Sequence, residues 1–196
     1  MTSPAVGAVD QAMMDVALAE AKASLAVGGV PVGAALAEGD RLLASGHNER
    51  VQRGDPIAHG EMSCLRNAGR QASYQDMTLY TTLSPCPMCS GAILLFQIPR
   101  VVVGEATTFA GDLAFLTSHG VEVVLVDDAR CTGVMQEFQE RYPGVWSEEI
   151  GGRELSAGGR RAEPQARRCG PSGPGDLLAA GQISGLLSPT APARDG

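Results

Sequence analysis

Apolar residues recur at helical spacing near the start of the chain. The apolar positions of residues 11–27 fall on one helical face: Met13, Met14, Ala17, Leu18, Ala21 and Leu25. Two glycines at 28–29 end the run. Residues 127–143 show the same spacing, with Val134, Phe138 and Tyr142 on one face. Both segments are predicted to be amphipathic helices that pack on a sheet.

Between these helices the pattern alternates between strand-like and helix-like segments. Residues 30–38 and 41–49 are short and apolar around a Glu-Gly-Asp turn, which predicts a β-hairpin. Residues 77–83 are rich in Thr and aromatic side chains, as strands are. Residues 100–105 and 121–128 are almost continuously β-branched, which is typical of strands covered on both faces.

Two further segments are rich in helix formers. Residues 59–72 place Met62, Leu65 and Ala68 three residues apart, and residues 87–97 begin with a proline, which suits the first helical turn. The full order is a helix, a hairpin, and then helices alternating with strands. It predicts a mixed sheet sandwiched between helices, forming one domain over residues 1–152.

The composition changes after residue 152. Residues 153–196 are rich in Gly, Pro, Ala and Arg and contain no aromatic residue, so they bury too little apolar surface to offset their ordering entropy. We expect a disordered tail. A short helix or docking segment within residues 176–187 is the alternative.

Charge excludes some classes of partner. Residues 1–152 carry nine basic and 18 acidic residues, whereas residues 153–196 carry six Arg and four acidic residues. A domain this acidic is a poor match for phosphate backbones, so we expect a small ligand and no nucleic acid. The chain lacks an apolar run of 18 residues and a recognisable signal sequence, which predicts a cytoplasmic protein with no membrane partner.

The five cysteines carry the first chemical signal. An odd number without secretory features makes a disulfide framework a poor explanation, so the thiols are expected to stay reduced. Cys86 and Cys89 form a Cys-x-x-Cys, which can be a redox dithiol, half of a zinc site or a packed pair. Cys64 and Cys131 are expected to be small core residues.

A second motif separates these possibilities. His59 stands two residues before Glu61, and the cysteines lie 25 or more residues later in Pro-Cys-Pro-Met-Cys. A His-x-Glu followed by Pro-Cys-x-x-Cys is the signature of zinc-dependent nucleobase deaminases, whereas thioredoxin-like motifs lack the upstream half. Two cysteines and one histidine give the three protein ligands of a catalytic zinc. The remaining histidines, His47 and His119, are expected to be structural or solvated.

The mechanism predicted from these parts is hydrolytic. Zinc at His59, Cys86 and Cys89 would lower the pKa of its water from 15.7 to about 7. Glu61, which is not a ligand, would accept the water proton, deliver it to a ring nitrogen and help protonate the departing amine. Backbone N–H groups near Cys86 are candidate donors to the developing tetrahedral centre.

The motifs also support a resemblance to a known family. The segments GGVPVGAAL, GHNERVQRG, HGEMSCLRNAGR, TLYTTLSPCPMCSGAI, IPRVVVGE and VEVVLVDDARC occur in an order and spacing similar to those of the fungal-type cytosine deaminases, members of the cytidine-deaminase-like zinc fold. The similarity runs from about residue 10 to residue 151. It implies a homodimer with a three-layer α/β/α sandwich around a central mixed sheet, and conversion of free cytosine to uracil and ammonia in pyrimidine salvage.

The resemblance implies roles for individual residues. Asn48 would hydrogen-bond the pyrimidine edge, helped by the backbone of Gly60, and the carbonyl of Ser84 would face the departing amine. The apolar walls of the pocket would be Val32, Leu83, Phe109 and Trp146. Outside the family context, Asn48 could equally be a turn residue and Trp146 a cap on the core.

One position departs from the family pattern. Near the C-terminus the family has an aspartate that accepts a hydrogen bond from the exocyclic amine, and this chain has Glu149 there. Ser147 replaces a phenylalanine of the family. A longer carboxylate moves the acceptor in a closed pocket, so the departure bears on which ring is bound.

Other functions remain open at this point. Deamination of guanine, cytidine or another small amino-heterocycle is the second enzyme hypothesis, with Glu149 tuned to that ring. Editing of tRNA or single-stranded nucleic acid is a third, which the acidic domain disfavours. A binding protein that retains only a structural zinc is the non-enzymatic alternative, but such a site has no use for Glu61.

Overall fold

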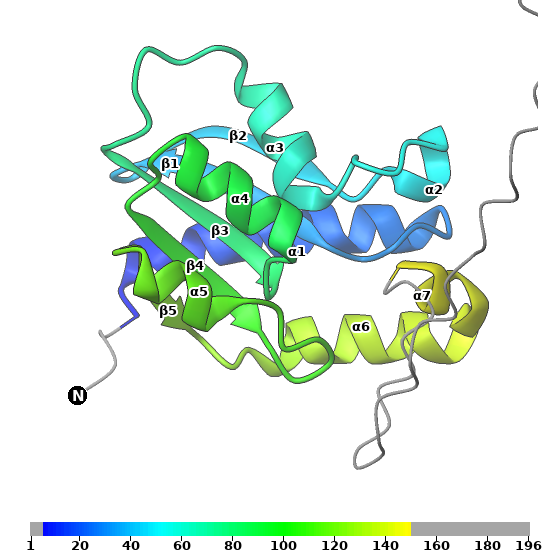
Figure 1. Ribbon diagram of the computed structural model, residues 1–196. Helices are drawn as coiled ribbons and strands as arrows, with labels where there is room; N and C mark the ends of the chain where they lie inside the picture. The colour runs from blue at the N-terminus through cyan, green and yellow to red at the C-terminus, as the bar shows by residue number, and fades with distance from the viewer. Residues whose placement is uncertain (1–5, 150–196) are drawn as a thin grey trace, which may run out of the picture. The chain divides into compact units, whose positions relative to one another are not determined.

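The computed structural model describes residues 6–149 (Figure 1). The chain divides into two units, Met1–Leu155 and Ser156–Gly196, and all described residues belong to the first. The predicted domain boundary near residue 152 and the predicted tail over residues 153–196 lie outside the described residues, so both stay predictions.

A five-stranded mixed sheet forms the centre of this unit. Its order is β2-β1-β3-β4-β5. The strands are β1 (Gly33–Glu38), β2 (Arg41–His47), β3 (Met77–Leu83), β4 (Arg100–Glu105) and β5 (Glu122–Leu125). β1 pairs antiparallel with β2 and β3, while β3, β4 and β5 run parallel. The predicted hairpin is therefore confirmed, and three parallel strands place their carboxyl ends at one edge.

Helices cover both faces of the sheet, as Figure 1 shows. On one face lie α1 (Ala8–Ala26) and α6 (Ala129–Arg141), and on the other lie α3 (Gly60–Ala68), α4 (Pro87–Leu95) and α5 (Leu113–Ser118). The short helices α2 (Arg50–Arg53) and α7 (Pro143–Glu149) complete the fold. The three-layer α/β/α sandwich is confirmed.

The core follows from the two-residue period of the strands. Leu79, Val101 and Val103 face α3, α4 and α5, while the intervening Tyr80 and Val102 face α1. All six apolar positions predicted for α1 are buried. A third apolar cluster lies where the ends of α1 and α6 meet the end of β3, and its members include Val32, Leu83 and Phe138.

Several predicted boundaries were wrong. The helix predicted for residues 59–72 ends at Ala68, because Gly69 adopts φ +68°, which a helix cannot continue. The strand predicted for residues 121–128 is only β5, at the edge of the sheet, and Leu125 is 38% exposed rather than covered on both faces. Two short helices, α2 and α7, were not predicted, because neither has a long apolar period.

The other sequence expectations can be placed as well. Cys64 and Cys131 are buried, as predicted, and the described cysteines form no disulfide. His47 lies on β2 and contacts Glu20, with 2.6 Å between Nδ1 and Oε2, while His119 ends α5 at the surface. Within residues 6–149 we find no helix with the length and apolar character needed to cross a membrane.

Candidate active site

His59 and Cys86 occupy equivalent positions on two helices. His59 is the N-cap residue of α3 and Cys86 the N-cap residue of α4, and both have extended backbone, with ψ of 163° and 169°. Pro87 suits the first turn of α4, because a backbone N–H at that position would have no acceptor within the helix and proline has none to satisfy. α4 directly follows β3 and so begins at the carboxyl edge of the parallel strands, and α3 begins beside it, because His59 Nδ1 lies 3.5 Å from Cys86 Sγ. The positive ends of two helix dipoles therefore meet at this edge, which favours thiolates.

The structure brings the three predicted metal ligands together. Ligand atoms of His59, Cys86 and Cys89 all lie within 4.8 Å of one another. Cys86 Sγ is 3.5 Å from His59 Nδ1. Cys89, in the first turn of α4, is buried, while His59 and Cys86 are partly exposed toward a cavity. Among the residues that the structure describes, no fourth His, Cys, Asp or Glu joins this group.

The protein groups alone already favour a thiolate at this place. A hydrogen bond from Cys89 outweighs burial and, together with His59, lowers the pKa of Cys86 to about 4. The same contact and burial hold the pKa of Cys89 well above its usual value. Burial lowers the pKa of His59, but the Cys86 thiolate outweighs it and raises that pKa to about 8. The two thiols thus share one proton, which a divalent cation would displace on binding.

These donors fit zinc. One imidazole nitrogen and two thiolate sulfurs are the ligand types that zinc prefers, and a set of three leaves one coordination position for water or substrate. A structural zinc needs four protein ligands, which the described residues do not supply here. The zinc cofactor inferred from the sequence is therefore consistent with the donor set and its surroundings.

Glu61 lies beside this donor set without belonging to it. Its side chain is buried, at 3% exposure, and its Oε2 is 3.4 Å from Cys89 Sγ. Burial raises the pKa of Glu61, and the Cys86 thiolate raises it further. A carboxyl group whose pKa is raised takes up a proton more readily than a free one, which suits a general acid and base.

A cavity of about 360 Å³ opens over these groups. Most predicted site residues line it, namely Val32, Asn48, His59, Glu61, Leu83, Ser84, Cys86, Phe109, Trp146 and Glu149. The volume lies at the lower end of the range for small-molecule sites. Cys89 and Gly60 are not among the lining residues. At Gly60, the first residue of α3, an added Cβ would approach the Val32 carbonyl oxygen to 2.7 Å, so α3 packs closely against residue 32.

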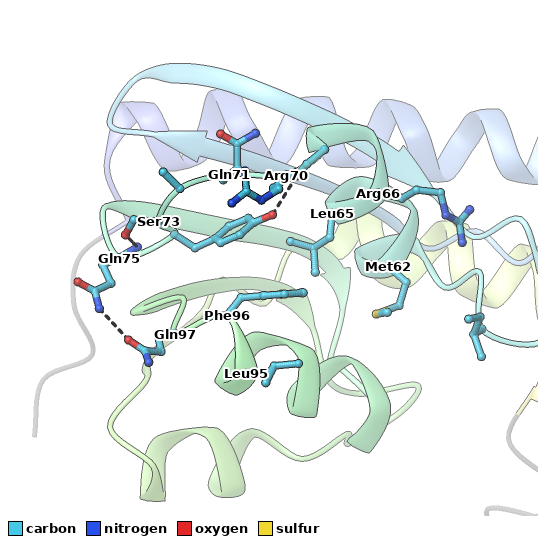
Figure 2. A pocket seen from close by; sticks show the side chains of 14 residues that line it. Met62, Leu65, Arg66, Arg70, Gln71, Ser73, Gln75, Leu95, Phe96 and Gln97 are labelled. Carbon is cyan, nitrogen blue, oxygen red and sulfur yellow. Dashed lines mark hydrogen bonds between the residues drawn. The ribbon is translucent and has the colours of Figure 1, made fainter. Parts of the chain in front are cut away.

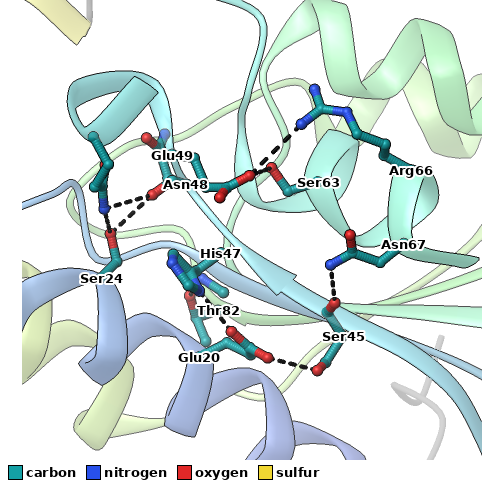
Figure 3. A network of polar contacts seen from close by, with 12 residues as sticks. Glu20, Ser24, Ser45, His47, Asn48, Glu49, Ser63, Arg66, Asn67 and Thr82 are labelled. Carbon is teal, nitrogen blue, oxygen red and sulfur yellow. Dashed lines mark hydrogen bonds and ion pairs between the residues drawn. The ribbon is translucent and has the colours of Figure 1, made fainter. Parts of the chain in front are cut away.

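Hydrogen bonds to its backbone carbonyl and to its side-chain amide hold Asn48 in place. Its side chain and backbone are 1% exposed, and its carbonyl oxygen accepts hydrogen bonds from Ser24 Oγ (2.9 Å) and Gln52 Nε2 (3.1 Å) (Figure 3). Its Oδ1 accepts the backbone N–H of Arg50 at 3.0 Å. Only an oxygen can accept that bond, so the amide nitrogen is the atom that faces Glu149, at 3.2 Å from Oε1.

Glu149 reaches the site from α7. Its side chain is 8% exposed, and Oε1 is 3.3 Å from His59 Nε2. Arg50 Nη1 lies 3.2 Å from Oε2. A carboxylate on the second nitrogen of a ligating histidine fixes the orientation of the ring. The pair that the sequence separates by 90 residues is thus in direct contact.

Four residues at or beside the cavity were not predicted. Val30, Pro87 and Met88 line it, and Arg50 contacts Glu149 from behind. Pro87 and Met88 lie inside the Pro-Cys-Pro-Met-Cys motif, so their place near the site follows from the motif. Arg50 carries no such signal, because its partner lies on the last described helix.

The fold and this site together define the class of zinc-dependent deaminases. The chain belongs to the family described as the cytidine and deoxycytidylate deaminase zinc-binding region, whose model matches residues 8–105. Over 145 residues the chain is 48% identical to cytosine deaminase of Candida albicans, covering 72% of this chain and 97% of that relative. It is therefore a homologue of cytosine deaminase and a zinc hydrolase that acts on C–N bonds.

More distant relatives act on other substrates. The tRNA-specific adenosine deaminase of Bacillus subtilis is 34% identical over 141 residues, covering 66% of this chain and 88% of the relative. The solved structure of guanine deaminase from Nitrosomonas europaea is similar with a TM-score of 0.56 and 25% identity, covering 71% of this chain and 89% of that one. The resemblance to the cytosine deaminases stated from the sequence is confirmed.

Proposed function

We propose that this protein hydrolyses free cytosine to uracil and ammonia. The observation that carries the proposal is the place of Glu61, a buried carboxyl group in the cavity and next to, but outside, the His-Cys-Cys donor set. The identity of 48% with a cytosine deaminase along almost its whole length supports cytosine over other rings.

The residues divide the reaction between them. His59, Cys86 and Cys89 would hold zinc, which supplies a Lewis acid and lowers the pKa of water. Glu61 takes one proton from the attacking water and gives it to the ring nitrogen, and the second water proton leaves with the amine as ammonia. The raised pKa of Glu61 suits both transfers.

The remaining cavity residues bind and orient the base. Because Asn48 Oδ1 already accepts the Arg50 N–H, its amide nitrogen donates to the carbonyl oxygen of the base. The Glu149 carboxylate accepts from the exocyclic amine, and the Ser84 carbonyl and Gly60 backbone face the ring edge. The apolar walls cover the faces of the ring and exclude water: Val32, Leu83, Phe109 and Trp146.

A second candidate substrate is a related amino-heterocycle such as guanine or cytidine. Glu149 favours it, because the cytosine deaminases that the chain resembles have the shorter aspartate at this position. Transfer RNA is a weaker candidate, since residues 1–152 carry twice as many acidic as basic residues.

Ammonia release from a panel of bases tests the proposal. Protein of measured zinc content is supplied with cytosine, 5-methylcytosine, guanine and cytidine. Cytosine is expected to have the highest kcat/KM. Turnover of another ring without ammonia from cytosine would overturn the substrate. Near-normal turnover by Glu61→Gln with zinc retained would overturn the role of Glu61.

We further propose that two copies associate through the face formed by α3 and α4. Apolar side chains are exposed there: Ile57 at 52%, Leu95 at 75% and Phe96 at 37%. Figure 2 shows Leu65, Leu95 and Phe96 around a hollow of about 740 Å³. Exposed apolar side chains that gather around one hollow favour an interaction surface, and the family that the chain resembles is homodimeric.

Sedimentation velocity tests the dimer. Leu95→Glu is expected to give a monomer, whereas Val27→Glu, at a position of similar exposure (66%) at the end of α1, should leave the dimer intact. A monomeric wild-type protein would contradict the proposal. A role in pyrimidine salvage stays a prediction that depends on the cytosine assignment, and the cytoplasmic location stays the expectation drawn from the sequence.

A further inference from the structure

Arg50 contacts two polar residues of the cavity, Asn48 and Glu149, neither of which is a predicted metal ligand. Its backbone N–H donates to Asn48 Oδ1 at 3.0 Å, and its guanidinium Nη1 lies 3.2 Å from Glu149 Oε2. Within residues 6–149 it is the one Arg or Lys whose side chain comes within 4.0 Å of Glu149. Arg50 therefore contacts both groups while lying outside the cavity itself.

Both oxygens of the Glu149 carboxylate contact neighbouring polar side chains. Oε1 faces His59 Nε2 at 3.3 Å and Asn48 Nδ2 at 3.2 Å, on the cavity side. Oε2 is buried and meets Arg50 from the other side. At 3.2 Å this contact is an ion pair by distance, although the angle is poor for a hydrogen bond, so Arg50 acts on Glu149 mainly through charge.

A glutamate at this position needs such support more than an aspartate would. It has one more rotatable bond, and each freely rotating bond spreads the acceptor over several positions. The cavity also contains a second carboxyl group, Glu61, and no Arg or Lys is among the described residues that line it. The Arg50 side chain is 24% exposed, so its attraction is only partly screened by water.

We propose that Arg50 is a positioning residue that fixes the Glu149 carboxylate with Oε1 directed at the amino group of the bound base. The proposal rests on the proposed function, because it concerns recognition of that amine. Arg50 does not touch the base. Its effect is exerted through Glu149, and it adapts the longer carboxylate to a pocket that otherwise resembles one built around aspartate.

The test compares two arginines of the same short helix. Arg50→Gln removes the charge that faces Glu149, while Arg53→Gln is the matched control, since Arg53 is 51% exposed and pairs with Glu49 at 3.0 Å. Arg50→Gln is expected to raise KM for the accepted base about tenfold and change kcat less than about threefold. Arg50→Lys should recover part of the loss, and Arg53→Gln should match the wild type.

A double-mutant cycle shows whether the effect passes through Glu149. In Glu149→Asp protein the shorter carboxylate withdraws from the guanidinium, so Arg50→Gln should then change KM by less than about threefold. The binding constant in a Glu61→Gln background, where the base is not consumed, provides the same comparison without turnover. If Arg50→Gln raised KM and weakened binding equally in wild-type and in Glu149→Asp protein, the proposal would be overturned.

A ligand pair separates positioning from a purely structural link between α2 and α7. The accepted base should bind about tenfold more weakly to Arg50→Gln, whereas its analogue without the amino group should bind as it does to wild type. Equal weakening of both ligands would mean that Arg50 only holds α7 in place. The base panel on wild-type protein decides the proposed function separately, because every Arg50 measurement uses whichever base that panel selects.

Discussion

Glu105 ends β4 with a carboxylate that is fully buried, at 0% exposure. Its Oε2 accepts the backbone N–H groups of Thr107 at 2.7 Å and Thr108 at 2.9 Å, and its Oε1 accepts the Thr108 hydroxyl. These bonds hold the start of the loop that carries Phe109 to the cavity. The backbone carbonyl of Glu105 also accepts the N–H of Ser84, another cavity residue, at 2.9 Å.

The size of the effect follows from the groups left without partners. Glu105→Ala removes the acceptor of two backbone N–H groups and one hydroxyl, and each buried unsatisfied donor costs about 1–3 kcal/mol. Thr107 is exposed, so water can satisfy part of the loss. We expect a decrease in unfolding free energy of about 2–3 kcal/mol. In Glu105→Gln the amide oxygen can accept both N–H groups, so the expected decrease is about 1 kcal/mol.

Urea unfolding followed by circular dichroism measures the global loss. Trp146, the single tryptophan of the chain, lines the cavity and reports the site by fluorescence. Glu105→Ala should also raise KM several-fold, because Phe109 loses its fixed position. Glu137→Ala, on the exposed side of α6, is the control and should change stability by less than about 0.5 kcal/mol.

Wild-type unfolding midpoints and wild-type KM values in both Glu105→Ala and Glu105→Gln would refute this role of the carboxylate. That result would mean that the loop holds its conformation without the carboxylate. A lower midpoint with an unchanged KM would refute only the link to Phe109.

Three further predictions concern metal, pH and packing. Cys89→Ser should lower bound zinc, measured by atomic absorption, and reduce ammonia release in proportion; full zinc content would contradict the ligand assignment. The hydrogen bond to Arg100 lowers the pKa of Asp10, so this pair contributes stability above the ordinary aspartate pKa of about 3.9, and the contribution is lost as pH falls through the lower folded-state pKa. Urea midpoints between pH 7 and pH 2 should therefore fall more steeply for wild type than for Asp10→Asn, and parallel curves would exclude the effect. Gly33→Ala should lower the melting temperature by several degrees, because the new Cβ would approach the Ala17 carbonyl oxygen of α1 to 2.0 Å; an unchanged calorimetric midpoint would show that α1 can shift freely.

The sequence was most informative where chemistry is encoded locally. His-x-Glu and Cys-x-x-Cys each lie at the start of one helix, so residue type and spacing are enough to predict the metal donors and the proton carrier from the sequence. The buried faces of α1 and α6 could be predicted for the same reason, since a helix repeats every 3.6 residues whatever it packs against. The boundaries of α3 and β5 could not, because a glycine conformation and an edge position in the sheet decided them.

The family and the reaction class could be deduced from the sequence, because the predicted ligands and Glu61 lie within two short motifs. How the cavity is built around Glu149 depends on the fold and could not be predicted from the sequence. Glu149 lies 90 residues from His59 and 99 from Arg50 in the chain, and folding places it within 3.3 Å and 3.2 Å of them. An ion pair depends on distance in space. No local pattern in the sequence indicates which distant charges the packing of α2 and α7 brings together.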